Sequence, residues 1–154
     1  MGESELTAEL DSEQTFTELA AGCARALRAA RVWPLVVGLT GDLGSGKTTW
    51  VRAMLRGLGF GGRVPSPTYT LLEQYVCGEL TIVHLDLYRL RGPDELEHLG
   101  LRDWLAEPVC WIAVEWPERV PQLASRCDLV LEFAVTRRVA RRIVASASLR
   151  VGTA

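Results

Sequence analysis

Residues 35–58 read LVVGLTGDLGSGKTTWVRAMLRGL, and this stretch decides the fold of the chain. Its centre, GDLGSGKT at residues 41–48, fits the phosphate-binding pattern G-x-x-x-x-G-K-[ST]. The continuous apolar run before it is typical of a parallel strand that is buried on both faces. Apolar residues at helical spacing follow the loop, and Gly57 and Gly59 mark the end of that helix. A strand, a glycine-rich loop and a helix in this order predict a phosphate-binding loop.

Lys47 is the one lysine in the 154-residue chain, and the other sixteen basic residues are arginines. A lysine ammonium is a compact charge on a flexible stem, whereas the arginine guanidinium is a rigid planar fork. We therefore expect Lys47 to bridge the β- and γ-phosphates of a nucleoside triphosphate, and the Thr48 hydroxyl to bind Mg²⁺. The backbone N–H groups that converge on the β-phosphate are those of Gly44, Ser45, Gly46, Lys47 and Thr48.

Two absences from the composition narrow the choice of nucleotide. The chain contains no asparagine, and its one lysine already lies in the loop. It therefore lacks the Asn-Lys-x-Asp element by which many GTPases read guanine. It also lacks the His-Arg-Asp…Asn loop of protein kinases. ATP is the expected nucleotide.

A nucleotide-bound magnesium ion needs an acidic partner, and two carboxylates follow apolar strands. Asp86 comes after residues 82–85, and Glu115 comes after residues 111–114. In an open parallel sheet both carboxylates emerge at the carboxyl edge, where ligands bind. Spacing leaves open which of them contacts the ion, and each also fits a carboxylate that caps a turn.

The segment SPTYT at residues 66–70 lies between the loop and the first of these carboxylates. Its hydroxyl groups fit a switch segment that is ordered by the γ-phosphate or that positions the attacking water. Pro65 and Pro67 also fit a plain turn, which is the simpler interpretation of the residues alone.

Strands that alternate with helices predict an α/β fold, with a mostly parallel sheet, antiparallel additions and flanking helices. The predicted strands after the loop are residues 70–76, 80–88, 109–114, 128–135 and 139–149, the last two as a hairpin. Pro93 is expected to open a helix.

The N-terminal residues 1–14 are polar and acidic, and we expect a loose lead-in before a single domain over residues 15–150. The sequence TFTE at residues 15–18 has the form of a capping box. The helix that follows is expected to turn Leu19, Cys23, Leu27 and Ala30 inward.

The overall composition is that of an ordinary globular protein, and its net charge of −2 gives no general affinity for nucleic acid. Four cysteines without C-x-x-C spacing predict free thiols. An acidic N-terminus and the absence of an apolar run near ~20 residues predict a cytoplasmic protein without a membrane span.

A small basic cluster near the C-terminus consists of Arg137, Arg138, Arg141 and Arg142. It fits contact with phosphates, RNA or an acidic partner. It also fits a charged edge strand that discourages sheet-to-sheet aggregation, which is the simpler interpretation.

Four blocks in this order resemble the TsaE (YjeE) family: GDLGSGKTT at residues 41–49, SPTY at 66–69, HLDLYR at 84–89 and EWPE at 115–118. The phosphate loop alone is generic, but the four blocks together are specific. The resemblance extends from about residue 15 to the final strands.

The resemblance implies a small P-loop ATPase of tRNA threonylcarbamoyladenosine biosynthesis, with ATP and Mg²⁺ and with slow hydrolysis. Its implied partners are TsaB and TsaD, the latter of which modifies the adenosine next to the anticodon. The family's ATPase binds and resets the TsaB–TsaD complex, and it meets tRNA only indirectly.

By position, the resemblance assigns Mg²⁺ to Thr48 and Glu115, and so prefers Glu115 to Asp86. It assigns Asp86 and Thr68 to hydrolysis and γ-phosphate sensing. The nucleotide-binding residues that it implies are Thr15, Gly41, Gly44, Ser45, Gly46, Lys47, Thr48 and Thr49.

Two other function classes share the same loop. One is a small-molecule kinase, which usually needs an arginine-bearing lid and an acceptor pocket, and no clear segment of the chain supplies either. The other is a nucleotide-sensing binding module in which hydrolysis is incidental.

Overall fold

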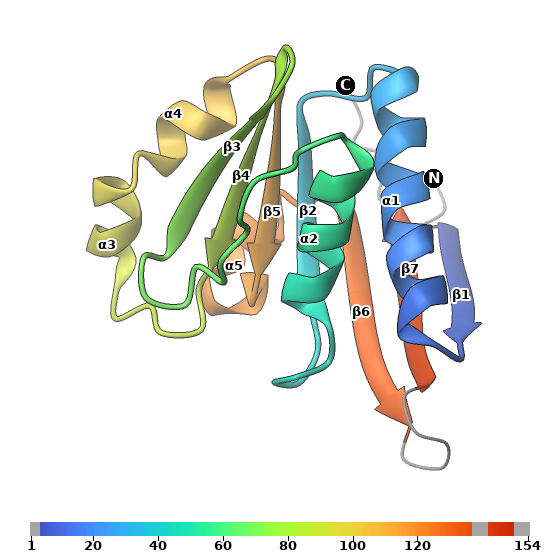
Figure 1. The fold of residues 1–154 in the computed structure, drawn as a ribbon. Coiled ribbons are helices and arrows are strands. Elements are labelled where there is room, and N and C mark those ends of the chain that lie inside the picture. Colours follow the sequence, from blue (N-terminus) through green and yellow to red (C-terminus); the bar gives the residue numbers. More distant parts are fainter. Residues whose placement is uncertain (1–3, 137–141, 150–154) are drawn as a thin grey trace.

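A seven-stranded sheet of order β1-β7-β6-β2-β5-β4-β3 forms the centre of the computed structural model, which describes residues 4–136 and 142–149 (Figure 1). The strands are β1 (Ser4–Leu10), β2 (Leu35–Thr40), β3 (Leu72–Cys77), β4 (Leu80–Asp86), β5 (Cys110–Glu115), β6 (Leu129–Thr136) and β7 (Arg142–Leu149). Strands β6, β2, β5 and β4 run parallel, and β3, β7 and β1 pair antiparallel at the two sides. The prediction of a parallel sheet with antiparallel additions is confirmed.

Helices cover both faces of this sheet. They are α1 (Glu13–Ala29), α2 (Lys47–Gly57), α3 (Pro93–His98), α4 (Leu101–Ala106) and α5 (Pro121–Ala124), with a 3₁₀ turn η1 (Pro117–Arg119). Val37 and Leu39 of β2 pack in the core cluster that contains α1 and α2. Val36 packs in the other cluster, with residues of α3, α4 and α5. Because β2 is buried on both faces, its apolar run is continuous.

The parallel strands bring the predicted site residues to one edge of the sheet. The arrows of β4, β5 and β6 point toward the edge where β2 passes into the glycine-rich loop (Figure 1). In the ladder, Glu115 of β5 lies opposite Leu39 on one side and opposite Asp86 on the other. The two carboxylates predicted at strand ends are therefore neighbours.

The segment expected to be a loose lead-in contains a strand, so that expectation was wrong. Strand β1 pairs antiparallel with β7 along its whole length, from Ser4 opposite Leu149 to Leu10 opposite Ile143. An edge strand needs few buried side chains, and in β1 Leu10 is buried while Leu6 is 77% exposed. Its polar composition therefore hid the pairing, which main-chain hydrogen bonds provide.

The first helix also begins earlier than the predicted capping box. Ser12 is the N-cap, and its hydroxyl accepts a hydrogen bond from the Thr15 N–H at 3.1 Å. The residues that α1 buries are Phe16, Ala20 and Ala24, whereas Cys23 is exposed. The buried face of α1 is thus shifted by about one residue from the predicted row of inward residues.

The later elements match the predictions closely. Strands β3 to β7 each overlap their predicted ranges, β6 and β7 form the predicted hairpin, and α3 begins at Pro93. Arg137, Arg138 and Arg141 of the basic cluster lie outside the described residues. Over the residues described, no helix has the length and apolar character that crossing a membrane requires.

Candidate nucleotide-binding site

The glycine-rich loop between β2 and α2 has a backbone that side chains would not fit. Gly41 has a φ of +140°, and a Cβ there would lie 2.5 Å from the Phe133 carbonyl oxygen. Gly44 and Gly46 have φ values of +75° and +111°. Gly46 is the N-cap of α2 and supplies no side-chain cap, so the first N–H groups of the helix remain available to an anion. The open space above Gly44 fits the approach of a phosphate.

Lys47 is buried inside this loop and is surrounded by oxygen atoms and the Trp116 ring. Only 5% of the residue is exposed. Its Nζ donates to the carbonyl oxygens of Gly41 at 2.5 Å and Asp42 at 2.8 Å, and it lies 4.3 Å from the centroid of the Trp116 ring. Burial lowers the pKa of Lys47, and the nearby carboxylates of Glu115 and Asp86 oppose that shift. The cation is therefore held at the loop with its donors directed at oxygen atoms.

Thr48 and Glu115 meet across the cleft. The Thr48 hydroxyl donates to both carboxylate oxygens of Glu115, at 2.9 Å and 3.0 Å. Glu115 is 3% exposed, and His84 Nε2 lies 2.6 Å from its Oε2. Because a carboxylate oxygen only accepts hydrogen bonds, His84 Nε2 is the donor in this contact, and in the described part of the chain His84 Nδ1 has no hydrogen-bond partner. The carboxylate is thus oriented from two sides.

These oxygen atoms suit a magnesium ion that is shared with a nucleotide. Magnesium prefers hard oxygen ligands and is usually bound by one or two carboxylates together with substrate phosphates. Among the described residues, no group of three or more His, Cys, Asp or Glu side chains is placed to hold a metal ion by itself. The Thr48 hydroxyl and the Glu115 carboxylate therefore fit the ion as a partial ligand set that phosphate and water would complete.

Asp86 lies beside this pair, on the next strand, and faces the segment at residues 66–70. Its Oδ1 accepts a hydrogen bond from the Tyr88 N–H at 3.0 Å, and its Oδ2 lies 3.4 Å from the Thr68 hydroxyl. The Thr68 hydroxyl is also 2.8 Å from that of Ser66. Burial raises the pKa of Asp86, and the negative charge of Glu115 adds to the rise. The predicted switch segment and the predicted carboxylate are therefore in contact.

A cleft of about 480 Å³ joins these groups. It is lined by the phosphate loop, by Ser66 and Thr68, and by both carboxylates. Other side chains on its walls are Leu43, Thr49, Tyr88, Arg89 and Trp116. Thr15 lies outside this lining, since it sits at the exposed start of α1 with its hydroxyl 2.8 Å from Ser12 Oγ. Apart from Thr15, the predicted site residues gather around one cleft or the loop that forms its floor.

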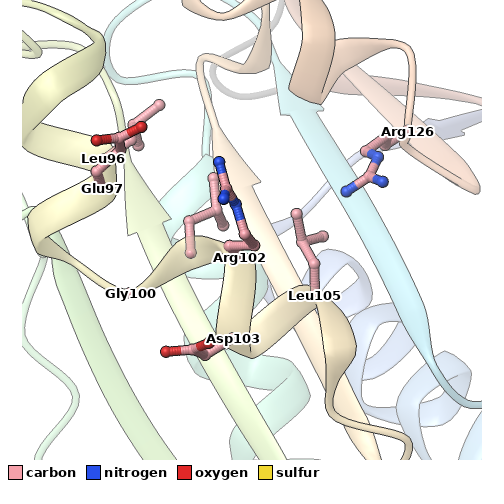
Figure 2. A pocket seen from close by; sticks show the side chains of 8 residues that line it. Leu96, Glu97, Gly100, Arg102, Asp103, Leu105 and Arg126 are labelled. Atoms are coloured by element: carbon pink, nitrogen blue, oxygen red, sulfur yellow. The ribbon is translucent and has the colours of Figure 1, made fainter.

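A second cavity, of about 450 Å³, is lined by residues of α3 and α4 together with Arg126 (Figure 2). Its walls carry Leu96, Leu101 and Leu105 beside Arg102 and Arg126. None of the predicted site residues lines it.

Sequence reasoning missed two features of the site. His84 has no predicted role, yet it contacts Glu115, and the available signal is its position two residues before Asp86 on the same face of β4. Trp116 has a φ of +61°, which is uncommon for a residue with a side chain. That backbone turn lets its ring meet both Lys47 and Tyr88, whose ring centroid is 5.0 Å away.

Comparison with known proteins gives a consistent result. A family model described as "Threonylcarbamoyl adenosine biosynthesis protein TsaE" matches residues 10–143. Curated relatives named "tRNA threonylcarbamoyladenosine biosynthesis protein TsaE" include one from Haemophilus influenzae, 46% identical over 64% of this chain and 62% of the relative. Another, from Aquifex aeolicus, is 34% identical over 87% of this chain and 90% of the relative.

The alignments with the relatives of higher identity are partial. The chain spans 62% of the length of the Haemophilus influenzae relative and 59% of that of a Synechocystis relative. A crystal structure of Bacillus subtilis YdiB superposes with a TM-score of 0.67, covering 98% of this chain and 89% of that one, at 22% identity. This structural likeness supports the fold.

Proposed function

The chain belongs to the TsaE family, and from this premise we propose that it binds Mg-ATP in the cleft and hydrolyses it slowly in support of tRNA threonylcarbamoyladenosine biosynthesis. The observation that carries the proposal is the meeting of three groups at one sheet edge. Lys47 is buried in a glycine-rich loop, and the Thr48 hydroxyl beside it is bonded to the buried carboxylate of Glu115.

In this proposal each group around the loop has one task. The N–H groups at the start of α2 and the Lys47 ammonium bind the β- and γ-phosphates. Thr48 and Glu115 hold Mg²⁺, which neutralises phosphate charge when it is bound. His84 keeps the Glu115 carboxylate directed at the ion through the contact at 2.6 Å. Thr15 stays a prediction for a nucleotide contact.

Asp86 and Thr68 are proposed to act on the attacking water. Hydrolysis breaks the bond between the γ-phosphorus and the bridging oxygen, and the water oxygen forms the new bond to phosphorus. One water proton stays with the inorganic phosphate and the other passes to solvent. The raised pKa of Asp86 suits a carboxylate that receives this proton transiently, and Thr68 is placed beside it to contact the γ-phosphate.

The proposed partners are TsaB and TsaD. Hydrolysis by this chain then changes the state of a TsaB–TsaD complex, and the chain contacts tRNA only through that complex. The relatives' names, which assign them to tRNA threonylcarbamoyladenosine biosynthesis, support this placement. The net charge of −2 agrees with an indirect contact with tRNA.

One experiment tests the proposal against its alternatives. The protein is incubated with γ-labelled ATP, tRNA and an activated threonylcarbamoyl donor, with and without TsaB and TsaD, while free phosphate and modified tRNA are followed. We expect slow phosphate release by the protein alone and faster release when the partners are present. Lys47→Ala should lose both the slow and the stimulated phosphate release. Rapid transfer of the label to a metabolite in the absence of the partners would instead identify a kinase. Tight ATP binding with no release under any condition would identify a sensing module.

A further inference from the structure

Arg89 is a second positive side chain at the cleft, and neither the phosphate loop nor the Thr48–Glu115 pair accounts for it. Among the described residues that line the cleft, the cationic side chains are those of Lys47 and Arg89. Asp86 and Glu115 add two carboxylates to the same walls. A bound triphosphate brings more negative charge than Mg²⁺ and one lysine neutralise, so the cleft has a use for a further cation.

The backbone ties Arg89 to the strand ends of the site. Arg89 lies in a turn in which the Leu90 N–H donates to the Leu87 carbonyl oxygen at 3.1 Å. The Leu87 side chain is fully buried, and its N–H donates to the Glu115 carbonyl oxygen at 3.1 Å. The Arg89 Cα is therefore fixed near both carboxylates, while its side chain is exposed and able to change rotamer.

The guanidinium of Arg89 makes only a weak, solvent-exposed contact. It lies 4.7 Å from the ring centroid of Tyr69, a side chain that is itself 82% exposed. In the described part of the chain Arg89 has no ion pair. A cation–π contact in solvent is weak, whereas a guanidinium binds phosphate oxygens through strong, often paired hydrogen bonds. A phosphate in the cleft would compete successfully with the Tyr69 ring.

We propose that Arg89 contacts the γ-phosphate of bound ATP and stabilises the charge that develops during hydrolysis. The inference rests on the proposed function, since it requires ATP in this cleft. As the bond from the γ-phosphorus to the bridging oxygen breaks and water attacks, negative charge spreads over the bridging and phosphoryl oxygens. The planar guanidinium matches two such oxygens at once. Until then the Tyr69 ring holds it beside the segment at residues 66–70.

Three variants test this role: Arg89→Ala, Arg89→Lys and, as the matched control, Arg91→Ala. Arg91 is exposed, carries the same charge two residues away and is not on the cleft walls. Calorimetry measures the affinity of each protein for Mg-ADP and for the magnesium complex of the β,γ-imido analogue of ATP. Phosphate release at saturating ATP gives the hydrolysis rate, with partners present.

Arg89→Ala should lower the affinity for the imido analogue by ~10–30-fold and leave Mg-ADP within ~3-fold of wild type. Its hydrolysis rate should fall by ~100-fold or more, and Arg89→Lys should recover little because an ammonium lacks the planar fork. Arg91→Ala should match wild type in all three measurements.

Two outcomes would overturn the role of Arg89. One is an Arg89→Ala protein that keeps either the analogue affinity or the hydrolysis rate within ~3-fold of wild type. The other is an equal loss of affinity for ADP and for the analogue, which would mean general attraction by charge. A wild-type protein that binds neither nucleotide would contradict the proposed function itself, and this inference with it.

Discussion

At the scale of single residues, the Glu115 carboxylate is the point where the site's side-chain hydrogen bonds meet. It accepts from the Thr48 hydroxyl at 2.9 Å and 3.0 Å and contacts His84 at 2.6 Å, while only 3% of it is exposed. A buried carboxylate with these partners has a fixed direction. Asp86, one strand away, is instead held by a backbone N–H and a long contact to Thr68.

This difference predicts separate effects for the two carboxylates. Glu115→Ala should weaken ATP binding at saturating Mg²⁺ by ~10-fold or more, because a metal ligand is lost. With EDTA present, its ATP affinity should stay within ~3-fold of wild type. Titrations with and without the metal measure both values. If Asp86→Ala shows that pattern and Glu115→Ala does not, the roles of the two carboxylates are reversed.

His84 is expected to act through Glu115. His84→Leu removes the donor at similar volume, so it should weaken the Mg²⁺-dependent part of ATP binding by ~10–100-fold. It should also lower the free energy of unfolding by ~1–3 kcal/mol, because a buried carboxylate loses a partner. His84→Gln, which retains a donor, should recover part of both losses. Magnesium titrations and thermal unfolding test this, and wild-type Mg²⁺ dependence in His84→Leu would contradict it.

Much of the candidate site could be predicted from residues alone. The glycine pattern identifies the loop, and apolar runs that end on carboxylates identify Asp86 and Glu115. Its position two residues before Asp86 places His84 on the same face of β4, but its contact with Glu115 depends on the pairing of β4 with β5, which the sequence does not state. The position of the Trp116 ring depends on a backbone turn with positive φ, which a tryptophan does not signal.

At the scale of elements, α1 packs closely against the C-terminal end of α2. A Cβ added to Gly57 would lie 2.6 Å from the Ala21 carbonyl oxygen and 2.7 Å from its Cα. Gly57, expected only to mark the end of α2, therefore also lets the two helices approach. By contrast, a Cβ at Gly61 would meet nothing within 4 Å.

These two glycines make a matched pair for mutation. Gly57→Ala should lower the free energy of unfolding by ~1–3 kcal/mol, because backbone atoms must move to admit the methyl group. Gly61→Ala should stay within ~0.5 kcal/mol of wild type. Denaturant unfolding monitored by circular dichroism measures both. Equal stability of the two variants would contradict the proposed close contact.

The type of each element was easier to predict than the buried face of a helix or the presence of an edge strand. The first helix was found from its period, yet its buried face contains Ala20 and Ala24 in place of Cys23. Small residues pack closely against a neighbouring helix, which a search for large apolar side chains overlooks. Strand β1 was missed because an edge strand can be polar and still pair through its main chain.

At the scale of the whole molecule, the burial of ionisable groups makes the free energy of unfolding decrease as the pH rises through the alkaline range. Burial raises the pKa of the Cys110 thiol from 9.0 to about 11, and it raises the pKa values of Cys77 and Tyr75 as well. A group whose pKa is raised on folding contributes stability that is complete below its unfolded value. That contribution is lost as the pH rises from about 9 through about 11.

Cys110 provides a test of this dependence. Cys110→Ala should be less stable than wild type at pH 8, because a buried side chain is truncated. The difference should shrink between pH 9 and pH 11, since only the wild type then loses the contribution of the protonated thiol. Urea midpoints at each pH measure it. A difference that stays constant over this range would contradict the raised pKa.

The overall architecture could be predicted from the phosphate-loop motif and the strand and helix on either side of it. A buried strand that leads into a phosphate loop implies a parallel sheet with helices on both faces, and this is the arrangement found. The strand order did not follow, because nothing in the sequence places β2 between β5 and β6. That order brings Glu115 beside the phosphate loop, so the geometry of the site depends on it.

The central claim is that Lys47 holds ATP in this cleft, and calorimetric titration with Mg-ATP tests it most directly. Lys47→Ala should bind at least ~30-fold more weakly than wild type, the equivalent of ~2 kcal/mol for lost charge-assisted bonds. Arg52→Ala removes a cation that donates to the Val64 carbonyl oxygen and does not line the cleft, so its affinity for Mg-ATP should stay within ~3-fold of wild type. A correctly folded Lys47→Ala protein with wild-type affinity would contradict the account.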